Sequence, residues 1–155
     1  MFVTLLIALA ALGLAIGAWF RPLPGNKPPS AEAKPTFTNQ QVADAKTSVC
    51  AAFKKTDRAL DLSSARDGGN DPTATLAVAT SVRQVLDFSS RYLHAKLAEE
   101  PATPPDLADA VRKLANSYQE VTMGYLAGLT NSDSDLQPSL HAGDEATFRI
   151  RGLCK

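Results

Sequence analysis

Residues 37–60 read FTNQQVADAKTSVCAAFKKTDRAL and carry the clearest helix signal of the chain. Thr38 and Gln41 have the spacing of a capping box, in which each side chain bonds the other residue's backbone N–H at a helix start. Apolar or small residues then recur at helical spacing: Val42, Ala45, Val49, Phe53, Thr56 and Leu60. The stretch therefore predicts a long amphipathic helix with one buried face.

A second helix is predicted after the break at residues 63–71. Asp71 followed by Pro72 is typical of an N-cap with proline at the first helical position. A second stripe of apolar residues follows at the same spacing: Leu76, Ala79, Val82, Leu86, Leu93 and Leu97.

Two more helices are predicted further along the chain. Thr103 with Asp106, and Ser134 with Gln137, have capping-box spacing. The third stripe consists of Leu107, Val111, Leu114, Val121 and Tyr125, and the fourth, weakened by a glycine, of Leu136, Leu140, Gly143, Thr147, Ile150 and Cys154. Strand-like alternation is nearly absent and the connections are short. We expect an all-α domain over residues 37–155, folded as an antiparallel four-helix bundle.

The first twenty residues are almost wholly apolar, with Thr4 as the one polar side chain. Twenty helical residues span about 30 Å, the thickness of the hydrocarbon core of a bilayer. Trp19 and Arg21 stand where aromatic and basic side chains meet the headgroups. We expect residues 1–20 to be a transmembrane helix in contact with membrane lipid. The alternative is a cleaved signal peptide, since small residues at 15, 17 and 18 fit a cleavage site.

Residues 21–36 form a linker with five prolines, at positions 22, 24, 28, 29 and 35. Such a segment favours an extended polyproline II conformation, about 3.1 Å per residue, and would hold the domain up to about 45 Å from the bilayer. A PxxP docking motif is the alternative to a simple spacer.

The orientation of the chain in the membrane rests on opposing signals. Three basic residues follow the apolar segment and none precedes it, which by the positive-inside rule places the domain in the cytoplasm. The two distant cysteines and the proline-rich linker favour an oxidising, extracytoplasmic compartment. We expect a single-pass protein of the cell membrane with an extracytoplasmic C-terminal domain.

Cys50 and Cys154 are the two cysteines of the chain. They fall near the middle of the first predicted helix and at the end of the fourth, which would be neighbours in the bundle. A structural disulfide is the favoured interpretation, with free buried thiols and a reactive or metal-binding pair as alternatives.

The charged and polar residues give no sign of catalysis. His94 and His141 lie beside the apolar stripes, the loop at 66–71 lacks the ligand spacing of a calcium site, and Glu99 and Glu100 point apart on a helix. No catalytic, phosphate-binding or dinucleotide motif occurs. Residues 37–155 carry 13 basic and 15 acidic side chains. A domain with this charge balance has no basic cluster to bind the phosphate backbone of a nucleic acid. We therefore expect no enzyme activity, cofactor, metal or nucleic-acid partner.

Four blocks of the sequence resemble a known group of proteins: VCAAF (49–53), RDGGNDPTATLAVATS (66–81), LAEEPATPPDLADAVRKLA (97–115) and AGDEATFRIRGLCK (142–155). The group consists of mycobacterial alanine- and proline-rich membrane-anchored proteins of uncharacterised function. The resemblance implies a location in the cell envelope and pairing of Cys50 with Cys154. It departs at the start of the chain, where such proteins have basic residues before the span.

Two functional hypotheses follow. The first is a tethered helical interaction module that binds an envelope protein or a cell-wall component without turnover. The second is a carrier that holds haem or a lipid between its helices. An apolar cleft would favour the carrier, and a solid core with an exposed apolar patch would favour the module.

Overall fold

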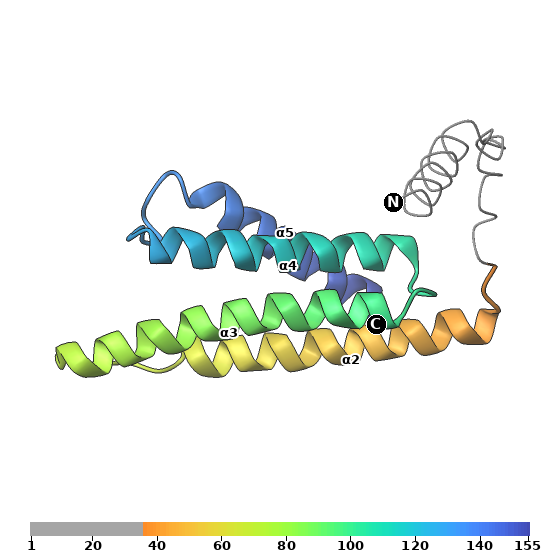
Figure 1. Cartoon of the computed structure of the whole chain (residues 1–155), viewed down its shortest axis with the longest axis horizontal. Coiled ribbons are helices and arrows are strands. Elements are labelled where there is room, and N and C mark those ends of the chain that lie inside the picture. Colours follow the sequence, from red (N-terminus) through yellow and green to blue (C-terminus); the bar gives the residue numbers. More distant parts are fainter. Residues whose placement is uncertain (1–35) are drawn as a thin grey trace, which may run out of the picture. The chain divides into compact units, whose positions relative to one another are not determined.

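The computed structural model describes residues 36–155, which contain four helices and no strand (Figure 1). The helices are α2 (Asn39–Ser64), α3 (Pro72–Glu99), α4 (Pro105–Leu126) and α5 (Gln137–Leu153). The all-α prediction is confirmed for this part of the chain. The predicted transmembrane helix at 1–20 and most of the linker at 21–36 lie outside the described residues. Among the helices described, none combines the length and apolar character that a membrane crossing requires.

The starts of α2 and α3 follow the predicted capping patterns. The Gln41 backbone N–H donates to Thr38 Oγ1 at 3.2 Å, and the Thr38 backbone N–H donates to Gln41 Oε1 at 2.8 Å. At α3, Asp71 Oδ1 accepts from the Thr73 backbone N–H at 2.8 Å, with Pro72 at the first helical position. Both caps satisfy backbone donors that a helix start leaves without an intrahelical partner.

The predicted capping boxes of α4 and α5 are wrong. Thr103 donates its hydroxyl to the carbonyl of Glu100 instead, so α4 starts at Pro105 without a side-chain cap. Ser134 hydrogen-bonds Asp135, and α5 also starts uncapped. Local turns compete for the same hydroxyl groups, and a proline within the first two positions of each helix already lacks one of the donors that a cap would satisfy.

The helices pack mainly in chain order: α2 on α3, α3 on α4, and α4 on α5 (Figure 1). Their facing sides enclose one core of side chains that are almost fully buried: Val49, Ala52, Phe53, Leu86, Leu93, Leu107, Ala110, Val111, Leu114, Ala115, Val121, Leu136, Ala146 and Ile150. Most of the predicted stripes supply this core. Burial of large aliphatic side chains at about 1.5–3 kcal/mol each is the main force that holds the helices together.

The predicted apolar stripe of α3 is wrong at Leu76, which is 63% exposed. The reason is helix length: α3 has 28 residues and α4 has 22. At 1.5 Å per residue α3 exceeds its neighbour by about 9 Å. Figure 1 shows the excess at the α2–α3 hairpin, whose tip extends past α4 and α5. The first turn of α3 therefore has only α2 beside it.

Gly143 is a close-packing position of α5. A Cβ atom added there would lie 2.7 Å from Ser117 Oγ on α4, well inside normal contact distance. The Ser117 hydroxyl donates to the Ser139 carbonyl, which ties the two helices together at this point. Gly143 thus permits the approach of α4 to α5, although in the sequence it only appeared to weaken the fourth stripe.

Candidate functional sites

The first candidate site is the cysteine pair. Cys50 on α2 and Cys154, just after α5, form a disulfide with their Cα atoms 5.7 Å apart and 104 residues apart in sequence. The structure thus places the two predicted cysteines together. In the chain-entropy model a cross-link of this span stabilises the fold by about 4.7 kcal/mol.

An ion pair joins the same two helices about two turns along α2 from the disulfide. Arg151 of α5 donates from Nη2 to both carboxylate oxygens of Asp57 on α2, at 3.0 and 2.9 Å. This hydrogen bond raises the pKa of Arg151 above its usual value. The contact was not predicted, because the sequence alone gives no pairing between charges 94 residues apart.

The second candidate site is a solvent-open cleft of about 500 Å³ that receives residues from all four helices. We call it the four-helix cleft. Its apolar walls consist of Leu60 from α2, Val82 and Leu86 from α3, Val121 from α4 and Leu140 from α5. Its charged residues are Asp57 and Asp61 from α2 and Asp144 and Arg151 from α5. The site combines an apolar interior with a predominantly acidic rim.

Two tyrosines of α4 line this cleft. Tyr118 is only 6% exposed, and its hydroxyl has no hydrogen-bond partner among residues 36–155. Burial, followed by the nearby charges of Asp57 and Asp61, raises the pKa of Tyr118 to about 12. Tyr125 donates its hydroxyl to Asn131, and burial raises the pKa of this phenol as well. Both phenols are protonated at neutral pH.

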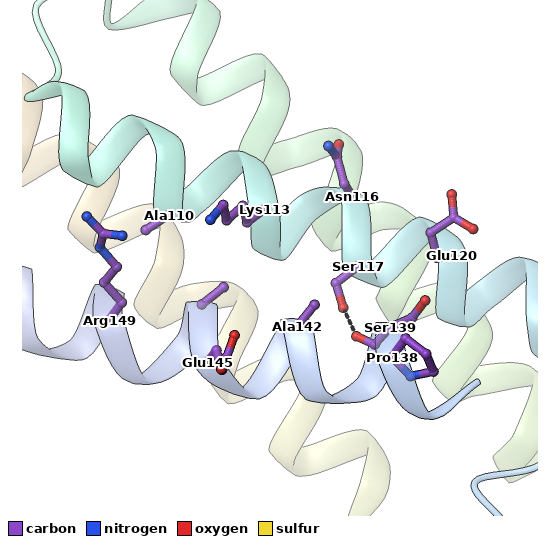
Figure 2. Close-up of a pocket in the computed structure, with 11 residues that line it drawn as sticks. Ala110, Lys113, Asn116, Ser117, Glu120, Pro138, Ser139, Ala142, Glu145 and Arg149 are labelled. Atoms are coloured by element: carbon purple, nitrogen blue, oxygen red, sulfur yellow. Dashed lines mark hydrogen bonds between the residues drawn. The ribbon is translucent and has the colours of Figure 1, made fainter. Parts of the chain in front are cut away.

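A separate groove of about 480 Å³ runs between α4 and α5 (Figure 2). Small residues, Ala110, Ala142 and Ala146, line it together with charged residues of both signs: Lys113, Glu120, Glu145 and Arg149. Figure 2 shows Asn116 and Glu120 pointing away from α5, and the Ser117–Ser139 hydrogen bond crossing from α4 to α5. The mixed charges give this groove no preference for one class of ligand.

The polar residues considered in the sequence do not meet at one site. His94 hydrogen-bonds Asn116 and His141 lies exposed 3.6 Å from Glu145, and neither lines the four-helix cleft. In the loop at 66–71, Asp67 accepts from the Gly69 backbone and Asp71 caps α3. Within residues 36–155, no three His, Cys, Asp or Glu side chains are grouped so as to hold a metal ion.

The third candidate site is a set of exposed apolar side chains. Leu62 at the end of α2, Leu76 at the start of α3, and Met123 and Leu126 at the end of α4 are each 58–63% exposed. Figure 1 shows that these helix ends lie on the same side of the domain. We call them the apolar end. The apolar end was not predicted from the sequence. The difference in length between the predicted helices could have indicated it, because the longer helix extends past its neighbour.

The comparisons with known proteins add no relative. The chain matches no family model, no curated protein and no solved structure. Functional inference therefore rests on the residues and on the geometry described above.

Proposed function

We propose that this protein is a membrane-tethered, extracytoplasmic helical interaction module of the cell envelope. The apolar segment at 1–20 and the proline-rich segment at 21–36 support the tether. The paired cysteines support an oxidising compartment, because disulfides are rare in reducing ones. The resemblance of four sequence blocks to membrane-anchored envelope proteins points the same way.

The proposal includes an antiparallel four-helix bundle as its rigid body. Two cross-links support this topology. Along α2 the chain passes Cys50 before Asp57, whereas along α5 it passes Arg151, the partner of Asp57, before Cys154. The register is therefore reversed between the two helices, as it would be for the first and fourth helices of an up-and-down bundle.

The apolar end carries the functional proposal. A monomeric domain gains nothing from four exposed apolar side chains at one end, whereas a partner that covers them gains about 1.5–3 kcal/mol for each large side chain buried. Aliphatic surface of this kind suits an apolar surface on another protein. A cell-wall polysaccharide would instead require polar groups and aromatic rings.

The position of the apolar end supports an envelope protein as the partner. Residue 37 enters at the start of α2, and Leu62 lies 23 residues beyond Asn39 on the same helix. At 1.5 Å per residue this distance is about 35 Å. A surface used to insert into the anchoring bilayer belongs next to the tether, whereas a surface at the far end is placed to meet a partner protein.

Site-specific photo-crosslinking in intact cells tests the proposal. A photoreactive amino acid is placed at Leu62, at Leu126, or at Phe148 as the control. Phe148 is 82% exposed on α5, more than any residue of the apolar end, and lies outside it. We expect Leu62 and Leu126 to capture the same protein, and Leu62→Asp to prevent capture from Leu126. Capture of lipid or wall polymer alone, equal capture from Phe148, or no adduct would refute the proposal.

The haem version of the carrier hypothesis has no support in the geometry of the cleft. Haem iron in proteins is held by an axial His, Cys, Met or Tyr. Neither histidine lines the four-helix cleft, both cysteines are engaged in the disulfide, and Tyr118 and Tyr125 are protonated phenols there. The acidic rim also disfavours fatty-acid carboxylates. A different ligand chemistry fits this cleft better.

A further inference from the structure

The rim of the four-helix cleft carries uncompensated negative charge. Three carboxylates, Asp57, Asp61 and Asp144, face one guanidinium, that of Arg151. Arg151 is bound to Asp57 through both carboxylate oxygens. Asp61 and Asp144 form no ion pair with any residue in the range 36–155. Two negative charges of the rim therefore lack a cationic partner.

A polar group inside the cleft also lacks a partner. The Tyr118 side chain is 94% buried, and its hydroxyl meets no hydrogen-bonding group of the described residues. That hydroxyl is not one of the fully buried polar atoms without a partner, which among the described residues are Arg83 Nε and Ser90 Oγ, so it opens onto the cleft and is free to hydrogen-bond a ligand there. This hydroxyl is independent of the acidic rim, yet it lines the same cleft.

The apolar walls limit the kind of cation that fits. Leu60, Val82, Leu86, Val121 and Leu140 surround the interior and would lie against an aliphatic chain. A bare metal ion is a poor match, because the described residues hold no cluster of three metal-ligating side chains. The charge, the hydroxyl and the apolar walls together require a cation carried on an apolar stem.

We propose that the four-helix cleft binds a small organic ammonium ion with an aliphatic stem. The stem lies against the leucine and valine walls. The ammonium group lies between Asp61 and Asp144, where it donates hydrogen bonds to the carboxylates and to the Tyr118 hydroxyl oxygen. This site is independent of the apolar end, because none of the four residues of the apolar end lines the cleft.

The test uses the full-length protein in nanodiscs of neutral phospholipid, with isotope-labelled tyrosine rings observed by NMR. Tyr118 and Tyr125 line the cleft, whereas Tyr92 lines a different pocket beside Lys55 and serves as the internal control. Tyr→Phe variants assign the signals. Three ligands with the same chain length are titrated: hexylammonium, hexanol and hexanoate. Empty nanodiscs provide the blank for partition into lipid.

We expect hexylammonium to shift the Tyr118 and Tyr125 signals and leave Tyr92 unchanged. Two ion pairs to the exposed carboxylates of Asp61 and Asp144 should make its dissociation constant about tenfold lower than that of hexanol. Hexanoate should not bind. Equal affinity for the three ligands, shifts confined to Tyr92, or no shift at all would overturn the proposal.

Variants separate charge recognition from simple apolar binding. The double substitution Asp61→Asn and Asp144→Asn should remove the tenfold preference for the ammonium over the alcohol. Both side chains are exposed, so the variant should keep its helical circular dichroism. Asp109→Asn is the control, since Asp109 pairs with Arg112 on the surface of α4 outside the cleft. A double variant that keeps the preference, or a control that loses it, would also refute the site.

Discussion

The contact between Gly143 and Ser117 leads to a prediction in which one substitution changes stability in opposite directions in two backgrounds. In the wild-type protein, Gly143→Ala places a Cβ atom 2.7 Å from Ser117 Oγ. The hydroxyl must move, and it then loses its hydrogen bond to the Ser139 carbonyl, which is worth about 1 kcal/mol. Overpacking adds a cost of about 1–3 kcal/mol, against a gain of about 1 kcal/mol in helix propensity. We expect a net loss of about 1–3 kcal/mol.

The same substitution should stabilise the Ser117→Ala protein. Without the hydroxyl, the nearest atom to the new methyl group is the Cβ of residue 117 at 3.6 Å, an ordinary van der Waals contact. The propensity gain of about 1 kcal/mol then remains uncancelled. The coupling between the two positions should therefore be about 2–4 kcal/mol, at or above the upper end of the range for residues in contact.

Urea unfolding of the four proteins, followed by far-ultraviolet circular dichroism, measures this coupling. The wild type, both single variants and the double variant complete the cycle. If Gly143→Ala lowers the free energy of unfolding by the same amount in both backgrounds, the Ser117 hydroxyl does not limit the approach of α4 to α5, and the reasoning fails.

Three further predictions concern titration, cross-linking and a helix end. The pKa of Tyr118 is about 12 in the folded protein and about 10 in the unfolded chain. The stability that this difference contributes is therefore complete below pH ~10 and is lost as the pH rises towards 12, by up to about 2–3 kcal/mol. Unfolding curves of Tyr118→Phe should not show this loss. Replacing Cys50 and Cys154 by Ser should lower the free energy of unfolding by up to about 4.7 kcal/mol, and a reductant should then have no further effect on the melting temperature. Gly128→Ala should cost about 1 kcal/mol, since Gly128 has φ 89°, whereas Gly152→Ala within α5 should be neutral or stabilising by thermal melting.

Local sequence patterns predicted the helices well where one residue pair determines the start. The Thr38–Gln41 box and the Asp71 cap depend only on neighbours within one turn, and both are present. The boxes predicted at Thr103 and Ser134 failed, because a turn of the preceding loop offered each hydroxyl another partner. Spacing alone does not rank such competing hydrogen bonds.

The end of α4 was not predicted, although the sequence contained its signal. Gly128 takes the left-handed conformation, its N–H donates to the Tyr125 carbonyl, and the Leu129 N–H donates to the Gly124 carbonyl. These bonds form a Schellman motif, in which glycine follows the last helical residues. A search for glycine after the third apolar stripe would have found it.

The candidate sites could be predicted only in part, because each depends on contacts between helices. The cysteine pair was predicted, since two cysteines admit a single pairing and helix order made them neighbours. The four-helix cleft was not predicted. Tyr118 can fill the core or line a cleft, and which of the two it does depends on the distances between the four helices near this residue. The ion pair between Arg151 and Asp57 could not be predicted either, because it also depends on how the helices pack.

The unequal lengths of the helices also make one region easier to open than the rest of the domain. The hairpin tip has only two helices, with no fully buried residue beyond Ser63 on α2 or before Leu86 on α3. Unfolding its last turns exposes little buried apolar area, so it costs far less free energy than global unfolding. Backbone amides near the tip should therefore exchange with solvent deuterium first. A partner bound to the apolar end would slow that exchange, which makes the tip a direct reporter of occupancy.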